Sequence, residues 1–367
     1  MVKTKNSAGK VVAFMLVLAL VVSLLAFITP KQTAQVQAAT LDREPGLYEA
    51  GTTNQTHTWD EVMAKLYAGK YESMAGFYFT VTAADDAWFT GDLVMGDFDT
   101  TENAALGRDV VLQEMFKKCT NLVSVDISKA SFPGYVNLCS MCKNATSIKS
   151  FNFGSFKVNN LSSYMTFLEF FYGCTNLKTV SGSIDFTGLD KEVYTMGEVS
   201  AKGGRIASMF ENCTSLESMD LTQLLKNTDI LLGAYSLFKG CTSLKSVKVG
   251  STLSTAIYFD NMFANCTSLK RIRLGALSAY ANIALPTAPD GTHYAVTSDI
   301  ATSITSITGE IANKTIELYG ADNKSLAPAE ETPVVPSTGV VSNTVAIVIV
   351  AVSMLALAVC VRKKKVR

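Results

Sequence analysis

Apolar and polar residues recur through the middle of the chain in one repeated string. The clearest copies are MFKKCTNLVSVDI, MFENCTSLESMDL, LFKGCTSLKSVKV and MFANCTSLKRIRL, which begin at Met115, Met209, Leu237 and Met262. The first part, Met-Phe-x-x-Cys, places apolar residues at near-helical spacing. A Thr-Ser or Thr-Asn turn follows, and then a stretch in which apolar and polar residues alternate as in a half-buried strand. Each copy therefore predicts a helical or irregular segment, a turn and a short strand.

Two weaker copies, MCKNATSIKSFNF from Met141 and FFYGCTNLKTV from Phe170, complete a series of six. The aligned column consists of Cys119, Ala145, Cys174, Cys213, Cys241 and Cys266, at spacings of 26, 29, 39, 28 and 25 residues. A period in the twenties is typical of a leucine-rich-repeat solenoid, and the longest step is one repeat that carries an insertion. We therefore expect an α/β repeat solenoid with one parallel sheet face and a cap at each end.

The MF-x-x-C-T-x-L strings resemble the leucine-rich repeat of BspA-like bacterial surface proteins. The resemblance covers about residues 93–280, half of the chain. Members of that family look like adhesins and host-interaction proteins. The resemblance therefore implies a solenoid fold and a binding role at a cell surface.

The two ends of the chain differ from the repeats. Lys3, Lys5 and Lys10 precede an apolar run, and small residues follow up to Ala38, which is the outline of a secretory signal. An uncleaved membrane anchor is the alternative. The expected organisation is a signal peptide (1–38), an N-terminal cap region (39–92), the solenoid (93–280), a C-terminal cap (281–320), a Pro/Ala/Glu linker (321–334) and a sorting signal with a transmembrane segment and basic tail (335–367).

The last segment begins with VPSTG, which consists of Val335, Pro336, Ser337, Thr338 and Gly339. An apolar run long enough to span a bilayer and a basic tail follow. This order resembles the LPXTG-like cell-wall sorting signal of Gram-positive surface proteins, with Val335 in place of the usual Leu. The resemblance implies that a sortase transpeptidase cuts after Thr338 and joins the chain to peptidoglycan. A plain transmembrane tail, held by the membrane only, is the alternative.

Charge excludes one class of partner. The full chain has 32 basic and 32 acidic residues, but nine basic residues and no acidic ones lie in the two segments expected to be removed. The mature chain would thus hold 23 basic against 32 acidic residues, a net charge of −9. Because phosphate backbones require a cationic surface, we expect no nucleic acid as a partner.

The cysteines form a structural ladder in this reading. Five of them, Cys119, Cys174, Cys213, Cys241 and Cys266, occupy the repeat column, and Ala145 interrupts it. Neighbouring coils would lie close enough for disulfides, but a buried free thiol also suits an inward ladder, and we favour free thiols. Cys139 and Cys142 form a CxxC, yet Cys142 falls in a column filled by phenylalanine elsewhere. We therefore expect no metal site, and no cofactor motif occurs.

Two surfaces are candidate binding sites. The residues that would point outward from the strands are mostly Ser, Thr, Asn and Asp, but the last two copies supply a basic edge of Lys245, Lys248, Lys270, Arg271 and Arg273. This edge could bind an anionic polymer, or it could be a solvated terminal face. The other candidate is the insertion Ser181–Arg205, in which Tyr194 could anchor a partner.

These features favour an extracellular binding or adhesion module over a catalyst. Nucleophilic hydrolysis usually needs a base beside the nucleophile, and the chain has only two histidines, neither of them within the repeats. We expect a host matrix protein or an anionic glycan as ligand, with the protein attached to the bacterial cell wall. The alternatives are a structural envelope protein held by a membrane helix and a surface enzyme that acts on glycans.

Overall fold

The computed structural model describes residues 43–69, 71–73, 76–79, 81, 83–98, 109–130, 136–159, 167–188, 205–228, 233–256, 258–279 and 281–329. The expected signal peptide and sorting signal lie outside these residues. None of the helices found in the described part of the chain is long and apolar enough to cross a membrane.

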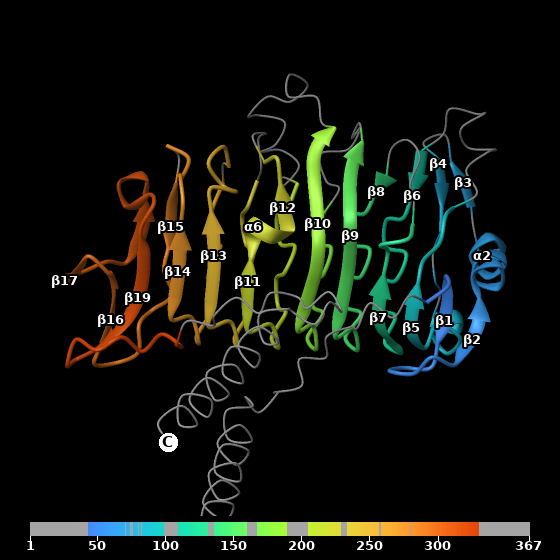
Figure 1. Cartoon of the computed structure of the whole chain (residues 1–367), viewed down its shortest axis with the longest axis horizontal. Coiled ribbons are helices and arrows are strands. Elements are labelled where there is room, and N and C mark those ends of the chain that lie inside the picture. The colour runs from blue at the N-terminus through green and yellow to red at the C-terminus, as the bar shows by residue number, and fades with distance from the viewer. Residues whose placement is uncertain are drawn as a thin grey trace, which may run out of the picture.

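The repeats stack into a solenoid that contributes one sheet strand per coil. We number the coils 1 to 6 by their column residues, Cys119, Ala145, Cys174, Cys213, Cys241 and Cys266. Strand β5 (Gly91–Val94) precedes them, and the coils contribute β7 (Leu122–Asp126), β9 (Ser150–Asn159), β10 (Thr179–Gly188), β11 (Ser218–Asp220), β13 (Ser246–Gly250) and β14 (Arg271–Leu274), which lie side by side in Figure 1. Neighbouring strands pair in parallel, which confirms the predicted parallel sheet face.

The sheet face is divided between coils 3 and 4. One sheet has the order β12-β10-β9-β7-β5-β1-β2, and the next has the order β11-β13-β14-β19-β16-β17. After β11 the chain forms the short helix α6 (Leu221–Leu224), because the Asp220 carboxylate accepts hydrogen bonds from the backbone N–H groups of Thr222 and Gln223 and caps that turn. Strand β12 (Leu225–Lys226) then pairs with the distal half of β10.

The wall opposite the sheet consists of turns instead of the helix that the apolar spacing allowed. Two residues in every coil have positive φ. One lies five residues before the column residue, and the other directly precedes it. The second of these is Asn or Gly in five of the six coils, the residues that adopt this conformation most readily. A left-handed residue at both places ends any helix, so the wall is irregular.

Hydrogen bonds within and between coils alternate along this back wall. The N–H groups of Ser208, Phe210 and Asn212 donate to carbonyls of coil 5 at 3.0, 3.0 and 2.7 Å. The intervening N–H groups of Met209 and Glu211 donate three residues back within the coil, at 3.3 and 3.1 Å. The back wall is therefore a second ladder between coils, and it bridges coils 3 and 4, where Phe171 N–H donates to the Met209 carbonyl at 2.9 Å.

Phenylalanines fill the space between the two walls. Phe171, Phe210, Phe238 and Phe263 stack face to face in successive coils, with ring centroids 5.5, 5.5 and 5.9 Å apart. All four side chains are fully buried. Since the stack crosses the interruption of the sheet, the apolar core joins coils 3 and 4 where β10 and β11 do not pair.

The N-terminal end of the solenoid is closed by antiparallel strands and a helix. Strand β1 (Gly46–Tyr48) pairs antiparallel with β5 and with the exposed β2 (Gln55–Thr58). Helix α2 (Trp59–Ala68) starts with Thr58 as N-cap, and Glu61 completes a capping box. A second sheet contains β3 (Tyr71–Ser73), β4 (Gly76–Tyr78), β6 (Asp109–Val111) and β8 (Val136–Asn137), and a short helix α3 covers Ala83–Asp86.

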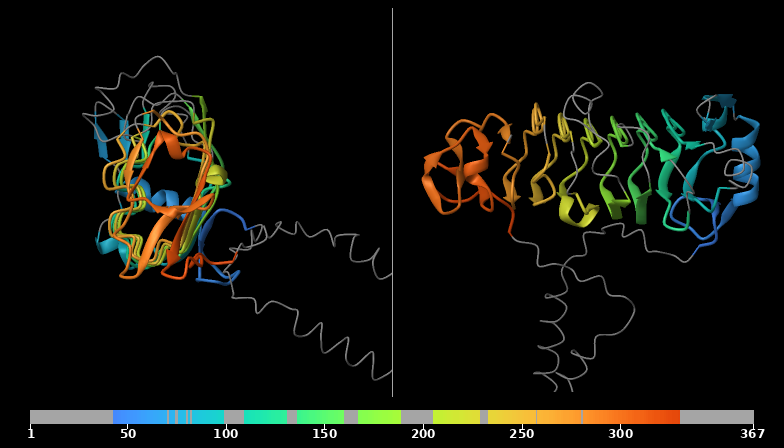
Figure 2. Two further views of the ribbon diagram at one scale, coloured as in Figure 1. Left: turned by 90° about the vertical axis from the view of Figure 1, so that its left-hand side faces the viewer. Right: turned by 90° about the horizontal axis from the view of Figure 1, so that it is seen from above.

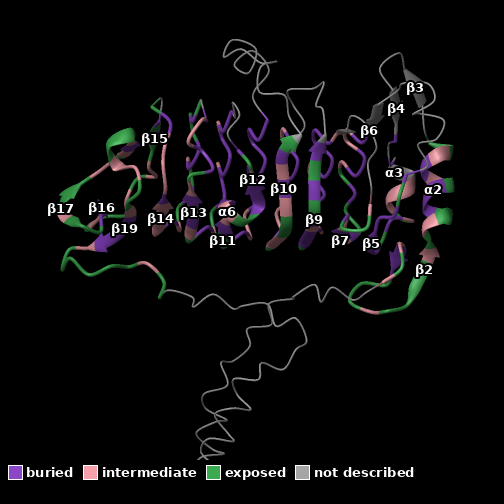
Figure 3. Cartoon of the chain, turned by 45° about the horizontal axis from the view of Figure 1, so that its top comes forward, coloured by how far each residue is buried: buried purple, intermediate pink, exposed green. Residues whose placement is uncertain are grey.

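At the other end, antiparallel strands continue the sheet beyond coil 6. Strand β19 (Thr315–Gly320) pairs with β14 and with β16 (Thr292–Val296), and β17 (Asp299–Ser303) forms the outer edge. A small hairpin-like pair joins β15 (Asn282–Ala284) to β18 (Ser306–Thr308), followed by the 3-10 helix η1 (Gly309–Ile311). Figure 2 shows these strands at the end of the solenoid, and Figure 3 shows exposed residues gathered on α2, β2 and β17.

Candidate functional site

The outward side of the sheet presents two rows of polar residues in register. One row runs through Asp92, Ser124, Ser150 and Thr179 and resumes with Ser218, Ser246, Arg271 and Glu317. The other runs through Asp126, Asn152 and Ser181 and resumes with Asp220, Lys248 and Arg273. We call these two rows the sheet face. The residues expected from the sequence to point outward from the strands are therefore aligned in two rows on the outer side of the sheet.

Side-chain hydrogen bonds between coils hold the first half of the sheet face in place. The Asn152 amide donates to Asp126 at 3.0 Å, and Ser181 Oγ donates to the Asn152 carbonyl oxygen at 3.2 Å. The Asp126 and Asn152 side chains also accept from the backbone N–H two residues ahead, at 2.8 and 3.0 Å. These Asx turns fix the end of β7 and the bend within β9, so the polar groups are ordered before any ligand arrives.

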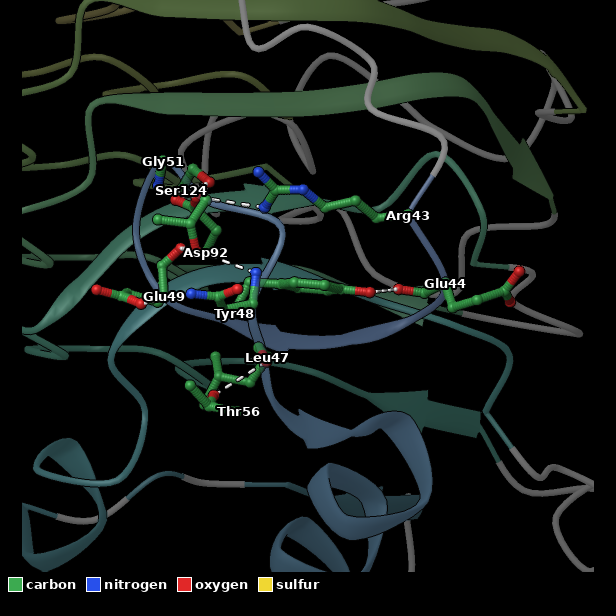
Figure 4. Close-up of polar contacts among 11 residues, drawn as sticks. Arg43, Glu44, Leu47, Tyr48, Glu49, Gly51, Thr56, Asp92 and Ser124 are labelled. Atoms are coloured by element: carbon green, nitrogen blue, oxygen red, sulfur yellow. Dashed lines mark hydrogen bonds and ion pairs between the residues drawn. The ribbon is translucent and has the colours of Figure 1, made fainter.

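The first strand of the sheet face carries a buried carboxylate. Asp92 accepts hydrogen bonds from Gly51 N–H and Ser124 Oγ, both at 2.7 Å, and pairs with Arg43 at 3.4 Å (Figure 4). The Arg43 guanidinium also lies over the Tyr48 ring, 4.8 Å from its centroid. With these partners Asp92 fastens the N-terminal segment to the solenoid, which is a structural role.

The structure pairs three cations of the basic edge with carboxylates. Lys245 lies 2.6 Å from Glu217 and Lys248 lies 3.1 Å from Asp220, so each pair joins coils 4 and 5. Burial raises the pKa of Asp220, but hydrogen bonds from Thr222 and Lys248 outweigh it and leave this pKa below the ordinary value.

Arg271 is the third of these cations. It bonds to Glu317 at 2.5 Å and donates to the Pro328 carbonyl at 2.8 Å. Arg271 therefore holds the last described segment against the sheet. The positive charge that the sheet face presents is smaller than the sequence suggests.

Lys270 and Arg273 complete the basic edge and are partly exposed. Tyr194 and the five residues of the VPSTG motif lie outside the described residues. Sequence reasoning missed two further lysines, Lys149 and Lys178, which are exposed at the same position of coils 2 and 3 that Lys245 and Lys270 occupy in coils 5 and 6. They could have been found from the aligned copies, because all four lysines lie four residues after the column residue.

The cysteine ladder is buried, and its thiols are free in the structure, as favoured from the sequence. The thiol of a column cysteine donates to a backbone carbonyl of the preceding coil. Cys213 bonds to Phe171 at 3.2 Å, Cys241 to Phe210 at 3.0 Å and Cys266 to Phe238 at 3.0 Å. Burial raises the pKa of Cys174 and Cys266 to about 12. These thiols are packing residues and weak donors, and they are not nucleophiles at neutral pH.

No group of three or more His, Cys, Asp or Glu side chains in the described part of the chain is arranged to hold a metal ion. Cys139 and Cys142 are both buried free thiols there. Cys142 occupies the phenylalanine position of coil 2, as expected.

The parallel coils, the second ladder and the polar sheet face define the protein as a leucine-rich-repeat solenoid. Residues 206–282 match the family described as BspA type Leucine rich repeat region (6 copies). This match begins just before coil 4 and ends just after coil 6. No curated protein and no solved structure matches the chain.

Proposed function

We propose that the chain is an exported cell-surface repeat protein that binds an extracellular macromolecule, a host matrix protein or an anionic glycan. The observation that supports this proposal is the sheet face, where two rows of small polar side chains are fixed in register on a rigid scaffold. Stacked repeats create extended surfaces of this kind. Side chains that are already ordered lose little entropy when a ligand binds.

A blocking substitution tests whether the sheet face is used. Ser218 lies exposed on β11 near the centre of the sheet face, so Ser218→Trp places a bulky ring over both rows. Binding of the full chain is measured against a panel of matrix proteins, acidic glycans and neutral glycans. We expect Ser218→Trp to abolish binding to any ligand of the panel that the wild type binds. Thr305→Trp, at an exposed position of the C-terminal cap, is the control and should bind normally.

Covalent attachment to the cell wall is part of the proposal and rests on the VPSTG motif. A sortase transpeptidase would join the Thr338 carbonyl to a peptidoglycan amine. We expect enzymatic wall digestion, but not detergent, to release the protein from cells, and Thr338→Ala to make it extractable by detergent. Release of the wild type by detergent alone would favour a plain membrane anchor.

Further experiments distinguish binding from the two alternative functions, a structural envelope component and a glycan-acting enzyme. Loss of cell-envelope integrity on deletion, with no ligand in the panel, would favour a structural envelope component. Shortening of a glycan during incubation with the protein would favour an enzyme. The sheet face favours binding over catalysis, because its carboxylates are held in hydrogen bonds that stabilise the coils. These carboxylates are Asp92, Asp126 and Asp220.

A further inference from the structure

The fourth position after the column residue carries a lysine in four of the six coils. Successive coils have Val123, Lys149, Lys178, Glu217, Lys245 and Lys270 there. Backbone hydrogen bonds show that these positions are stacked: Lys178 N–H donates to the Lys149 carbonyl and Lys270 N–H to the Lys245 carbonyl, both at 2.9 Å. Coils 3 and 4 are joined at the adjoining turn, where Ser215 N–H donates to the Thr175 carbonyl at 3.1 Å. We call Lys149, Lys178, Lys245 and Lys270 the lysine row.

Like charges are neighbours twice along the lysine row. Each lysine of the row is the residue just before a strand, and the first paired residues of those strands are Ser150 with Thr179 and Ser246 with Arg271. Lys149 therefore lies beside Lys178, and Lys245 lies beside Lys270. Like charges at such opposed positions are destabilising, as they are within a sheet. A bound anion between them would remove this cost.

Several lysines elsewhere in the described coils have a carboxylate partner, whereas the lysine row has one such pair among its four members. Lys143 pairs with Glu169 and Lys239 pairs with Glu211, at 2.5 and 2.9 Å, each across one coil boundary. In the lysine row only Lys245 has such a partner, Glu217. Among the residues that the structure describes, Lys149 and Lys178 have no ion-pair partner and are exposed.

We infer that the lysine row binds a linear polyanion that lies along the solenoid axis. The row runs across five coils, and at a strand spacing of ~4.8 Å its outermost lysines are roughly 19 Å apart. Four cations with one intervening carboxylate give this line a net positive charge, whereas the mature chain would be acidic. A chain of regularly spaced phosphates or carboxylates fits this line, while a single small anion would contact only one lysine pair. The inference rests on the proposed binding function and names the partner class.

The test compares two triple variants of the full chain that change its net charge equally. In Lys149→Gln/Lys178→Gln/Lys270→Gln, three members of the row lose their charge without breaking a described ion pair. In the control, Lys118→Gln/Lys157→Gln/Lys314→Gln, three exposed lysines elsewhere are neutralised. Binding to poly(glycerol phosphate), to polygalacturonate and to neutral dextran is measured at about 50 and 200 mM salt.

We expect both polyanions, or one of them, to bind the wild type and to be weakened by added salt, and dextran not to bind. The row variant should bind polyanion about tenfold or more weakly, because three counterions fewer are released, while the control variant should stay within about twofold of the wild type. Phosphate-only or carboxylate-only binding identifies the source of the anion. The variant Lys149→Arg/Lys178→Arg/Lys270→Arg keeps the positive charge of the row and should therefore bind polyanion with the wild-type affinity.

Three results would overturn the inference: equal weakening in the row and control variants, polyanion binding that is insensitive to salt, or no polyanion binding by the wild type. If the wild type fails with polyanions but binds a matrix protein in a way that Ser218→Trp abolishes, the lysine row is rejected and the proposed function is retained. If it binds nothing in either experiment, both are rejected. Circular dichroism of each variant confirms that the fold is unchanged.

Discussion

At the scale of single residues, the column cysteines are explained by two needs that few side chains meet together. The position is completely enclosed, so it needs a small apolar group, and a carbonyl of the preceding coil lies about 3 Å away. A thiol fills the space and donates weakly to that carbonyl. Ala145 fills the same position without donating, so coil 2 lacks this bond. The ladder can therefore tolerate the loss of one donor.

Thiol accessibility is the first prediction at this scale. We expect none of the seven described cysteines to react with a water-soluble disulfide reagent at pH 7.5 in the native protein, since all seven are buried. All seven should react after unfolding in guanidinium. The measurement is absorbance of the released thiolate, with Thr242→Cys at an exposed turn position as a positive control. Rapid reaction of a column cysteine in the native protein would contradict the packing described here.

Alkaline pH should destabilise the protein through the same thiols. Burial raises the pKa of Cys174 and Cys266 to about 12, whereas the ordinary value is 9.0. Unfolded thiols thus release their protons first, so stability is complete below about pH 8.5 and falls as pH rises toward 12. Each such thiol contributes a slope of about 1.4 kcal/mol per pH unit in that range. Denaturant unfolding at several pH values measures this slope. The free energy of unfolding of Cys174→Ala/Cys266→Ala should decline less steeply with pH than that of the wild type.

At the scale of elements, the bend in the middle of β9 and β10 depends on glycine. Gly182 has φ of +80°, and a Cβ there would lie 2.4 Å from the Gly154 backbone nitrogen of the neighbouring strand. Gly182→Ala should therefore cost about 2–4 kcal/mol, from backbone strain together with the clash between coils. Gly51→Ala is the matched control, because Gly51 has φ of +74° and open space around it, and should cost only about 1 kcal/mol. Equal losses in chemical denaturation would show that the close approach of the strands is unimportant.

The elements also show what the sequence could and could not predict. The repeated string sets the register of the coils, so the parallel strands, the outward polar residues and the inward cysteines follow from it. The back wall does not follow, because Glu114, Ser140 and Lys118 adopt positive φ without being residue types that favour it. Two ion pairs of the basic edge join residues 28 positions apart, and they emerge only when neighbouring copies are compared column by column. The third joins Arg271 to Glu317, which lies outside the repeats.

Helix α6 illustrates a different limit. DLTQLLK carries an N-cap signal at Asp220, but a helix of only one turn is too short for apolar periodicity to reveal. The sequence therefore predicted one continuous sheet, and the structure divides it at this point.

At the scale of the whole molecule, the divided sheet raises the question of how coils 1–3 and coils 4–6 remain one unit. Stability in a solenoid is the sum of coil stabilities and of the interfaces between neighbours. At the boundary of coils 3 and 4, β10 and β11 do not pair, and only the two-residue strand β12 of coil 4 pairs with β10. The interface therefore depends largely on the stacked rings of Phe171 and Phe210, on back-wall hydrogen bonds such as that from Phe171 N–H to the Met209 carbonyl, and on the thiol bond of Cys213. We expect this interface to be enough for a single cooperative unfolding transition in the wild type.

Phe210→Ala tests this dependence. Removing a buried phenylalanine costs about 3–5 kcal/mol, and here the loss falls on the interface between coils 3 and 4, where β12 and β10 form the strand pairing and β11 does not join it. We expect the unfolding of Phe210→Ala to separate into two transitions, and hydrogen exchange to show that the coils on the two sides of the boundary open independently. Phe263→Ala removes the same ring from coil 6, where β14 remains paired on both sides, so it should lower stability by a similar amount and keep one transition. One transition in both variants would mean that the remaining back-wall bonds and the short pairing of β12 with β10 are enough to couple the two halves. Two transitions in the wild type would mean that the core stack never coupled them.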